Sequence, residues 1–297
     1  MIRAAMTATA TVKGAGRRRL DWGRAVFYVL LTALAAFMAL PLIFMVNQAF
    51  KPAEELFLFP PRFFVRNPTL KNFHDLLMSA DTMLVPFSRY VFNSLLVTVS
   101  TVLLTVISAS LAAYAVAKHR APGSGWLFTL VVSALMFAPH VTQIPRYMIV
   151  NSLGLVDTYW ALILPALASP YALFLMKQFI EPLPDALLEA AKVDGASEWR
   201  IFWQVVMPMA RPAWATLTIL TFITTWNDFF TPLIFTQSEV MKTLPLALIT
   251  IYGGPGQVAR YGASQAATFL MTVPTIALFI LMQRRVIQTM AYSGIKS

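Results

Sequence analysis

Long apolar runs alternate with short charged segments along the whole chain. A helix that crosses the hydrocarbon core of a bilayer needs roughly 20 consecutive, mostly apolar residues. Runs of that kind predict six spans, at about residues 25–46, 90–117, 126–145, 158–177, 212–236 and 264–284. The pattern therefore predicts an all-α membrane protein whose spans and their connections form one domain over residues 25–287.

The first apolar run could be mistaken for a cleavable signal peptide, because the basic sequence RRRLDWGR precedes it. The run at 25–46 is longer, however, than the roughly 7–15 apolar residues that form the core of a signal peptide. We therefore expect an uncleaved first span that follows a polar tail over residues 1–24.

The lysines and arginines predict the orientation of the spans. Cytoplasmic segments next to membrane spans carry an excess of these residues. If the N-terminus is inside, most of the 23 lysines and arginines lie in segments on that side, chiefly in the tail 1–24 and the connection 181–211. Both termini are then expected in the cytoplasm, the second as a short tail at 288–297, with a long external loop at 47–89.

The external loop is unusually apolar for a connecting segment. It contains the aromatic and proline-rich sequence LFLFPPRFFVRNPTL and an amphipathic stretch around Asn72 to Met78. Such residues favour packing on the membrane surface or against a partner protein. A loop that merely rests at the interface is the alternative, because aromatic residues are enriched there in any case.

The composition supports a membrane protein and argues against several other classes. Hydrophobic residues make up 58% of the chain and charged residues only 12%, a balance that is difficult for a soluble domain of this length. Cysteine is absent, and His74, His119 and His140 are too far apart in sequence to suggest a metal site. The net charge of +10 flanks apolar runs, so a nucleic-acid partner is not expected. No catalytic set of side chains stands out.

The connection at 181–211, between the fourth and fifth spans, is the longest expected cytoplasmic segment. Asp185 favours the start of a helix, Gly195 suits a left-handed helix stop, and Ser197 can cap a second helix. We therefore expect two short helices joined at a glycine elbow. The first would hold an apolar stripe that comprises Ala186, Leu187, Ala190 and Ala191.

The elbow has the residues of a docking element. The small residues Ala190, Ala191 and Gly195 allow close entry into a cleft, and Glu189 and Asp194 can form charge-assisted hydrogen bonds with a partner. A solvated hairpin at the membrane interface is the alternative reading of the same pattern.

Four ordered blocks of the sequence resemble a known family. Glu189, Ala190, Ala191, Gly195 and Pro208 resemble the EAA loop of permease subunits in bacterial ATP-binding-cassette (ABC) importers. The likeness is to carbohydrate-uptake permeases of the maltose and glycerol-phosphate type, in the form with six spans. It extends over NSLLVTVSTVLLTVISASLAAYAVAK from Asn93, NSLGLVDTYWALILP from Asn151, DGASEWRIFWQVVMP from Asp194 and TFITTWNDFFTPLIF from Thr221.

The resemblance implies a set of partners. The EAA loop would dock on a separate ATPase and couple nucleotide-driven closure to opening of the transmembrane path; its residues here are Glu189, Ala190, Ala191, Asp194, Gly195 and Pro208. Two ATPase copies, a second homologous permease and an external solute-binding protein are expected. The tail MAYSGIKS only approximates the C-terminal sequence of the family. The resemblance therefore does not imply a contact between this tail and the ATPase.

The chain contains no Gly-Lys pair and therefore no P-loop, so it is expected to bind no cofactor itself, with ATP and Mg²⁺ on the partner. Sugar sites combine aromatic rings with a few placed polar groups. Asn93, Trp226, Asn227 and Asp228 are therefore the candidate residues of the substrate path. An ion-coupled secondary transporter or channel is the alternative function, but such proteins usually need several intramembrane ionisable groups, and Asp228 is an isolated acid in the fifth span.

Overall fold

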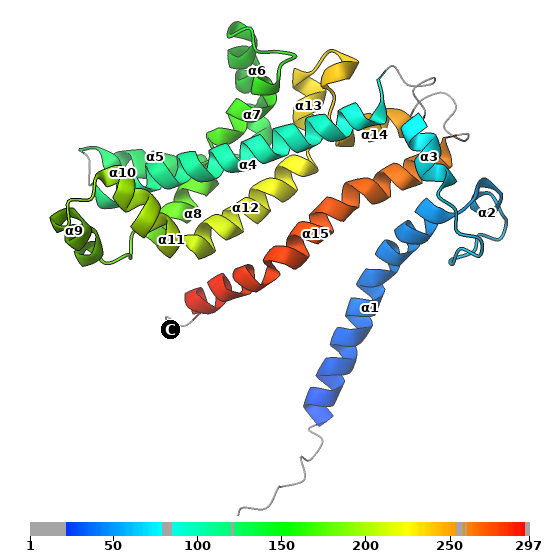
Figure 1. Ribbon diagram of the computed structural model, residues 1–297, viewed down its shortest axis with the longest axis horizontal. Helices are drawn as coiled ribbons and strands as arrows, with labels where there is room; N and C mark the ends of the chain where they lie inside the picture. Colours follow the sequence, from blue (N-terminus) through cyan, green and yellow to red (C-terminus); the bar gives the residue numbers. More distant parts are fainter. Residues whose placement is uncertain (1–21, 79–84, 120–121, 254–257, 259, 295–297) are drawn as a thin grey trace, which may run out of the picture. The chain divides into compact units, whose positions relative to one another are not determined.

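The computed structural model describes residues 22–78, 85–119, 122–253, 258 and 260–294, except for the side chains of 139–140, 250–253 and 284–294. The described residues form helices and connecting segments without any β-strand, as the sequence predicts (Figure 1). The chain divides into two compact units, residues 1–46 and 47–297. Of the predicted tail at 1–24, residues 1–21 lie outside the described part of the chain.

Three described helices are long and apolar enough to cross a membrane. They are α1 (Trp22–Phe50), whose residues up to Val46 make up the described part of the first unit, α4 (Phe87–Lys118), and the apolar part Tyr261–Gln283 of α15 (Tyr261–Gly294). Two bent helix pairs raise the number of candidate spans to five. The helix α15 also continues through most of the predicted tail at 288–297, of which residues 295–297 lie outside the described chain.

The fourth predicted span, 158–177, is a bent pair. The helices α7 (Tyr159–Leu167) and α8 (Pro170–Ile180) meet at 44°. Pro170 lacks an N–H and disfavours helical geometry at the residue before it, so α7 cannot continue through this point. The hydroxyl of Ser169 instead accepts a hydrogen bond from the N–H of Ala172 at 3.2 Å and caps α8.

The third predicted span, 126–145, is not one continuous helix in the structure. The helix α5 (Ser124–Ala134) ends well before Pro139, and the chain continues through the 3₁₀ turn η2 (Pro139–Thr142) into α6 (Gln143–Ser152). Pro139 and Pro145 lie within the predicted span, and Pro139 accounts for the interruption because it cannot donate the helical hydrogen bond. The prediction placed an apolar segment correctly but overlooked this break.

The fifth predicted span, 212–236, is also divided. The helix α12 (Arg211–Trp226) ends before Asp228, and a second short helix, α13 (Phe230–Phe235), follows. Asp228 therefore lies between two helices, not within one continuous helix as the sequence suggested. At its start, α12 follows the preceding helical segment Glu198–Met209 at an angle of 79°.

Shorter helices complete the second unit. They are α2 (Ala53–Leu56), α3 (Lys71–Met78), α9 (Asp185–Val193), α10 (Glu198–Ile201), the π-helical turn η3 (Phe202–Val206), α11 (Met207–Met209), the 3₁₀ turn η4 (Glu239–Met241) and α14 (Leu244–Gly253). The helix α3 confirms the amphipathic stretch predicted around residues 72–78.

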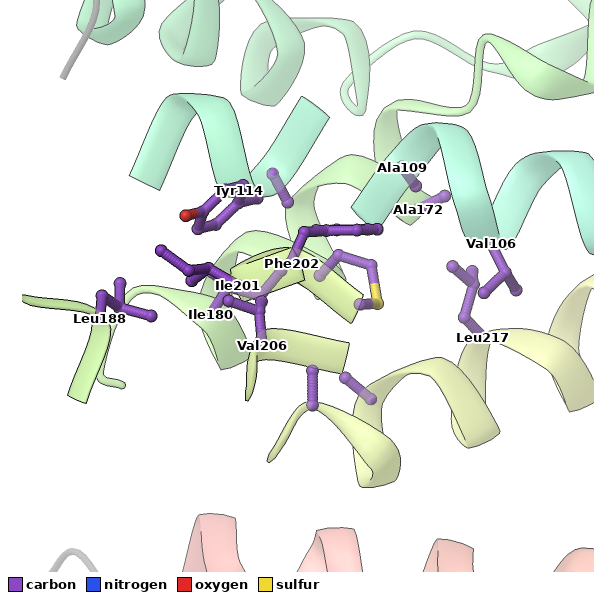
Figure 2. Close-up of a cluster of buried hydrophobic side chains, with 14 residues drawn as sticks. Val106, Ala109, Tyr114, Ala172, Ile180, Leu188, Ile201, Phe202, Val206 and Leu217 are labelled. Carbon is purple, nitrogen blue, oxygen red and sulfur yellow. The ribbon is translucent and has the colours of Figure 1, made fainter. Parts of the chain in front are cut away.

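The largest buried cluster joins α4 and α8 to the connection at 181–211 and the start of α12. Figure 2 shows Ile201, Phe202 and Val206 from that connection in one cluster with Tyr114 of α4 and Ile180 of α8. Alanines at 109, 113, 172 and 213 are buried in the same cluster and let the helices approach closely. The connection is therefore packed into the helix bundle at its C-terminal part.

Candidate functional site

The glycine elbow predicted at residue 195 is present. The helix α9 ends at Val193, Gly195 has a φ of 76°, and α10 begins at Glu198. The N–H of Ala196 donates to the carbonyl of Ala191 and that of Gly195 to the carbonyl of Lys192, both at 3.0 Å, which is the Schellman pattern of a helix end. The hydroxyl of Ser197 accepts from the N–H of Arg200 at 3.4 Å, so it caps α10 as expected.

The outward face of the elbow is apolar as well as charged. In α9 the chain buries Leu188 and half-buries Ala191, whereas the other members of the predicted stripe, Ala186, Leu187 and Ala190, are exposed. Val193 is 88% exposed at the tip. Three of the four stripe residues are thus turned away from the rest of the chain, whereas Ala191 packs beside Leu188 against the buried cluster. Glu189, Asp194 and Gly195 are exposed beside the stripe.

Glu198 attaches the elbow to the last turns of α4. Its carboxylate accepts a hydrogen bond from the hydroxyl of Tyr114 at 2.8 Å, and lies 2.6 Å from Lys192 Nζ and 3.5 Å from His119 Nε2. The hydrogen bonds from Lys192 and Tyr114 lower the pKa of Glu198 below its ordinary value, against a smaller opposing effect of burial. The carboxylate is therefore ionised at neutral pH, the form that holds all three partners.

A second attachment comes from Lys118, the last residue of α4. Its ammonium group donates to the carbonyls of Glu181 and Leu183 and lies 2.7 Å from the carboxylate of Asp185. Asp185 is in the first turn of α9, where a negative charge is also favoured by the helix dipole. Both ends of α9 are thus connected to α4, one through Lys118 and the other through Glu198.

Pro208 lies in α11 and is half-buried, away from the exposed tip of the elbow. The indole N–H of Trp214 donates to the carbonyl of the preceding residue, Met207, at 3.1 Å. This contact fixes the sharp turn into α12. Pro208 therefore contributes to the shape of the connection, whereas Glu189, Ala190, Asp194 and Gly195 form its accessible surface.

Asn93 is fully buried, and its hydrogen-bonding groups already have partners. Its amide nitrogen donates to the carbonyls of Val240 and Lys242 at 2.7 and 2.8 Å, and its oxygen accepts from the hydroxyl of Tyr159 at 2.8 Å. Asn93 therefore positions the segment 236–243 against α4.

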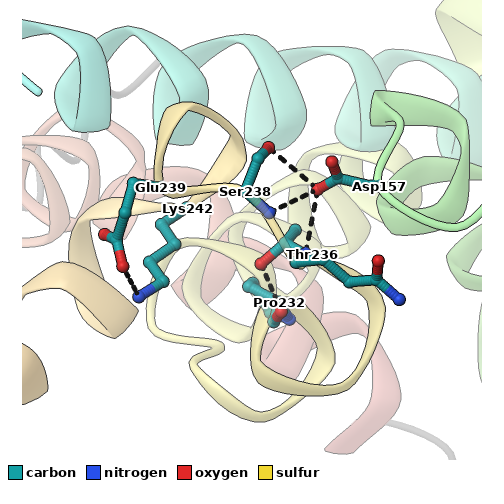
Figure 3. Close-up of polar contacts among 7 residues, drawn as sticks. Asp157, Pro232, Thr236, Ser238, Glu239 and Lys242 are labelled. Atoms are coloured by element: carbon teal, nitrogen blue, oxygen red, sulfur yellow. Dashed lines mark hydrogen bonds and ion pairs between the residues drawn. The ribbon is translucent and has the colours of Figure 1, made fainter. Parts of the chain in front are cut away.

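Asp157 also holds this segment, through its carboxylate (Figure 3). Its carboxylate accepts hydrogen bonds from the N–H of Gln237 at 2.9 Å, and from the N–H and hydroxyl of Ser238, both at 3.0 Å. Burial alone would raise the pKa of Asp157, but these three hydrogen bonds lower it below the usual value. Asp157 adopts this position with a φ of 63°, which is uncommon for a residue with a side chain.

Trp226, Asn227 and Asp228 do not share one environment. Trp226 is buried; it stacks on Phe222 with ring centroids 5.7 Å apart and donates to the carbonyl of Met271 at 2.8 Å, which joins α12 to α15. Asn227 is exposed, with its amide bonded to the carbonyl of Ile223 at 2.8 Å. Asp228 accepts from the N–H groups of Phe230 and Thr231, at 2.9 and 3.1 Å, and caps α13.

A small cavity of about 20 Å³ lies beside Asp228, with room for about one water molecule or one hydroxyl group. Six of its nine lining residues carry a hydroxyl or carboxylate group, and the other three are apolar. The hydroxyl of Thr243 is buried and has no hydrogen-bond partner among the described residues. The lining residues are Ser94, Val97, Thr98, Leu162, Thr225, Asp228, Thr231, Pro232 and Thr243.

Sequence reasoning missed Glu198, Lys118 and Asp157. The hydrogen bonds of Glu198 and Lys118 join positions 84 and 67 residues apart, and those of Asp157 span about 80. Sequence patterns that depend on residue spacing cannot identify contacts between positions so far apart. One weak signal was present, since Lys118 and Glu198 both lie in segments that were predicted to be on the cytoplasmic side of the membrane.

A family model and individual relatives both assign the chain to a family of transport proteins. Residues 109–292 match the family described as "Binding-protein-dependent transport system inner membrane component". The arabinooligosaccharides transport system permease protein AraQ of Halalkalibacterium halodurans is 31% identical over 283 residues, which cover 93% of this chain and 97% of the relative. The sn-glycerol-3-phosphate transport system permease protein UgpE of Yersinia enterocolitica is 34% identical over 199 residues, covering 67% and 71%.

A solved structure shares the fold. It is a chain from the crystal structure of a bacterial ABC transporter involved in the import of the acidic polysaccharide alginate, with a TM-score of 0.80. The match covers 91% of this chain and 99% of the solved one, at 21% sequence identity. An experimental structure therefore contains the same fold.

Proposed function

Because the chain belongs to the family of binding-protein-dependent transport system inner membrane components, we propose that it is one of two permease subunits of a bacterial importer for a sugar or sugar-like solute. As an ABC-transporter permease it is a non-catalytic, multi-pass membrane protein, and ATP is hydrolysed on a separate subunit. Membership of this family also favours ATP-driven import over the ion-coupled alternative.

The proposed topology has six spans and both termini in the cytoplasm of the bacterial cell, with the chain in its inner membrane. The bent pair α7 and α8 would form the fourth span, and α5 together with the segment up to α6 the third. The fifth would consist of α12 and α13. This arrangement keeps the elbow and the N-terminal tail on one side and the loop at 47–89 on the other, in agreement with the distribution of lysine and arginine.

The elbow is proposed to dock on the ATPase. This proposal is supported by one observation: the elbow exposes an apolar and acidic surface and is firmly attached to α4. A solvated hairpin would need neither an exposed Val193 and Leu187 nor two separate connections to a central helix. A groove with basic or amide groups would complement Glu189 and Asp194. We propose two ATPase copies, which would bind ATP and Mg²⁺, for the complete transporter.

The solute is proposed to be a sugar or a related polyhydroxylated compound, delivered by an external solute-binding protein. Two named relatives carry arabinooligosaccharides and sn-glycerol-3-phosphate, which supports this class. In the candidate path, Asp228 and the hydroxyl-lined cavity offer polar groups, and Thr243 offers a buried hydroxyl without a partner among the described residues. Asn93 and Trp226 are proposed to shape the path by holding segment 236–243 and α15.

Co-purification tests the docking proposal. The tagged chain would be purified with its ATPase as wild type and as the variants Glu189→Lys and Gly195→Trp. Gly154→Trp is a matched control, because Gly154 also has a positive φ, 66° against 76°, and an added side-chain carbon would meet nothing within 4 Å at either glycine. We expect the ATPase to be retained by the wild type and the control and lost from both elbow variants. Equal retention by all four would refute the proposal.

A further inference from the structure

We propose that residues 57–64, the apex of the loop between α1 and α4, bind the lipid headgroup region of the membrane surface. The apex exposes five large apolar side chains, and Phe59 at its tip is 92% exposed. The other four are Phe57, Leu58, Phe63 and Phe64. So much aromatic surface, exposed together within eight consecutive residues, is unfavourable in water and marks a contact surface.

The apex is held rigidly at its base. The buried carboxylate of Glu55 accepts hydrogen bonds from the N–H groups of Arg66 and Asn67, at 3.1 and 3.0 Å. The buried ammonium group of Lys51 donates to the carbonyl of Arg62. Both contacts tie the residues around and after the apex back to those before it. The aromatic side chains are therefore presented by an ordered backbone, which lowers the entropic cost of binding a surface.

The base in turn packs against the first turn of a membrane span. Asn72 of α3 donates to the carbonyls of Ala49 and Lys51, at 2.9 and 2.7 Å. Gly262 of α15 lies so close that an added side-chain carbon would be 2.3 Å from Asn72 Oδ1. Figure 1 shows α3 beside this end of α15.

This packing places the apex near the membrane interface. The ring of Phe57 lies 5.9 Å from that of Tyr261, the first residue of the apolar span Tyr261–Gln283. At about 1.5 Å per residue, that span is roughly 34 Å long, slightly more than the thickness of the hydrocarbon core, which is roughly 30 Å. Tyr261 is therefore expected near the boundary between hydrocarbon and headgroups, and the apex at the same level.

The charges of the apex favour lipid over a protein partner. Arg62 lies within it and Arg66 two residues after its end, and both are exposed. Guanidinium groups bind phosphate in bidentate geometry, and aromatic rings are enriched at the level of the headgroups. The arginines of the apex region therefore suit the lipid phosphates, and its aromatic rings suit the level of the headgroups.

Depth measurement with spin labels tests the proposal in the full transporter, reconstituted in phospholipid nanodiscs. The chain has no cysteine, so Phe59→Cys and Phe64→Cys would each carry a single label. Ile280→Cys in α15 is the lipid reference, and Asp75→Cys on α3 is the water reference. We expect apex labels about 5–10 Å below the phosphates, the depth of interfacial segments.

A second variant separates the role of the base from that of the apex. Gly262→Ala is expected to displace Asn72 and increase the mobility of the Phe59 label without any change in the chemistry of the apex. The proposal is overturned if the Phe59 and Phe64 labels are as accessible to water as the label at position 75. It is also overturned if they become shielded only when the solute-binding protein is added, since the apex would then be a protein contact.

Discussion

At the scale of single residues, the structure depends on a few side chains that hold distant backbone segments. Asp157 is the clearest case, because one carboxylate satisfies two N–H groups and a hydroxyl of residues 237 and 238. Its backbone also has the left-handed conformation that most residues avoid. Such a position tolerates few residue types.

We predict that Asp157→Ala destabilises the protein by about 2–4 kcal/mol, through backbone strain and the loss of charge-assisted hydrogen bonds. Asp157→Asn should have a smaller effect, because asparagine tolerates this conformation and keeps one acceptor oxygen. Thermal unfolding of the purified chain in detergent measures both. Equal stability of the alanine variant and the wild type would show that these contacts contribute nothing.

The lowered pKa of Asp157 gives this prediction a pH dependence. A carboxyl group with a lowered pKa stabilises the fold above its unfolded pKa, and the stabilisation is lost as the pH falls through the folded value. The stability difference between wild type and Asp157→Asn should therefore be constant from neutral pH to about 5 and shrink below about 4. A difference that shrinks near pH 7 would contradict this assignment.

Glu198 allows a matched comparison with Glu181. The two side chains are similarly exposed, at 48% and 52%, but among the described residues the carboxylate of Glu181 pairs only with Lys177 in the helix that Glu181 follows. We predict that Glu198→Ala weakens the coupling of ATP hydrolysis to uptake, whereas Glu181→Ala does not. Each should change stability by about 1 kcal/mol or less, because the groups are half-exposed. The measurement is the amount of solute taken up per ATP hydrolysed in proteoliposomes. An equal ratio for the two variants would show that Glu198 has no role in coupling.

At the scale of elements, periodicity predicted helices well and their interruptions poorly. The spans at α1, α4 and α15 follow directly from long apolar runs, and the elbow follows from Gly195 and Ser197 as local signals. Pro139 and Pro170, where helices are interrupted, are visible in the sequence. A long apolar helix can also contain a proline, however, as Pro41 in α1 and Pro274 in α15 show. Tertiary packing decides between the two outcomes, and a single sequence does not contain it.

The candidate path stays a prediction, whereas the conformation of the elbow is seen directly. Asn93 and Trp226 were selected for their polar and aromatic chemistry, but the structure gives their polar groups partners within the protein. A buried polar side chain needs such partners, so residue type alone cannot distinguish a ligand contact from a structural one. The elbow was easier because capping and glycine conformation are local properties.

Two glycines allow the elbow to be tested as an element. Gly195 and Gly123 have similar φ angles of 76° and 85°, and an added side-chain carbon would meet nothing within 4 Å at either position. We predict that Gly195→Ala and Gly123→Ala each cost about 1–2 kcal/mol of stability, from conformation alone. Only Gly195→Ala should reduce ATPase binding. If both variants bind the ATPase equally well, the geometry of the elbow is not needed for docking.

At the scale of the whole molecule, α4 connects the two candidate sites. Its last turns hold the elbow through Tyr114 and Lys118, and its first half lines the cavity beside Asp228 through Ser94 and Thr98. The distance along the helix from Ser94 to Tyr114 is roughly 30 Å at about 1.5 Å per residue. Because α4 is one continuous helix of 32 residues, a displacement of the elbow is expected to reach the cavity through it.

The proposed coupling requires that the tip of the elbow contacts the ATPase. Site-specific cross-linking in the assembled transporter tests this claim, since the chain has no cysteine of its own. A photo-cross-linker attached to Val193→Cys should capture the ATPase subunit, whereas the same reagent on Leu153→Cys, an exposed position after α6, should not. Capture from position 153 but not from 193, or from neither in a transporter that hydrolyses ATP, would contradict the account.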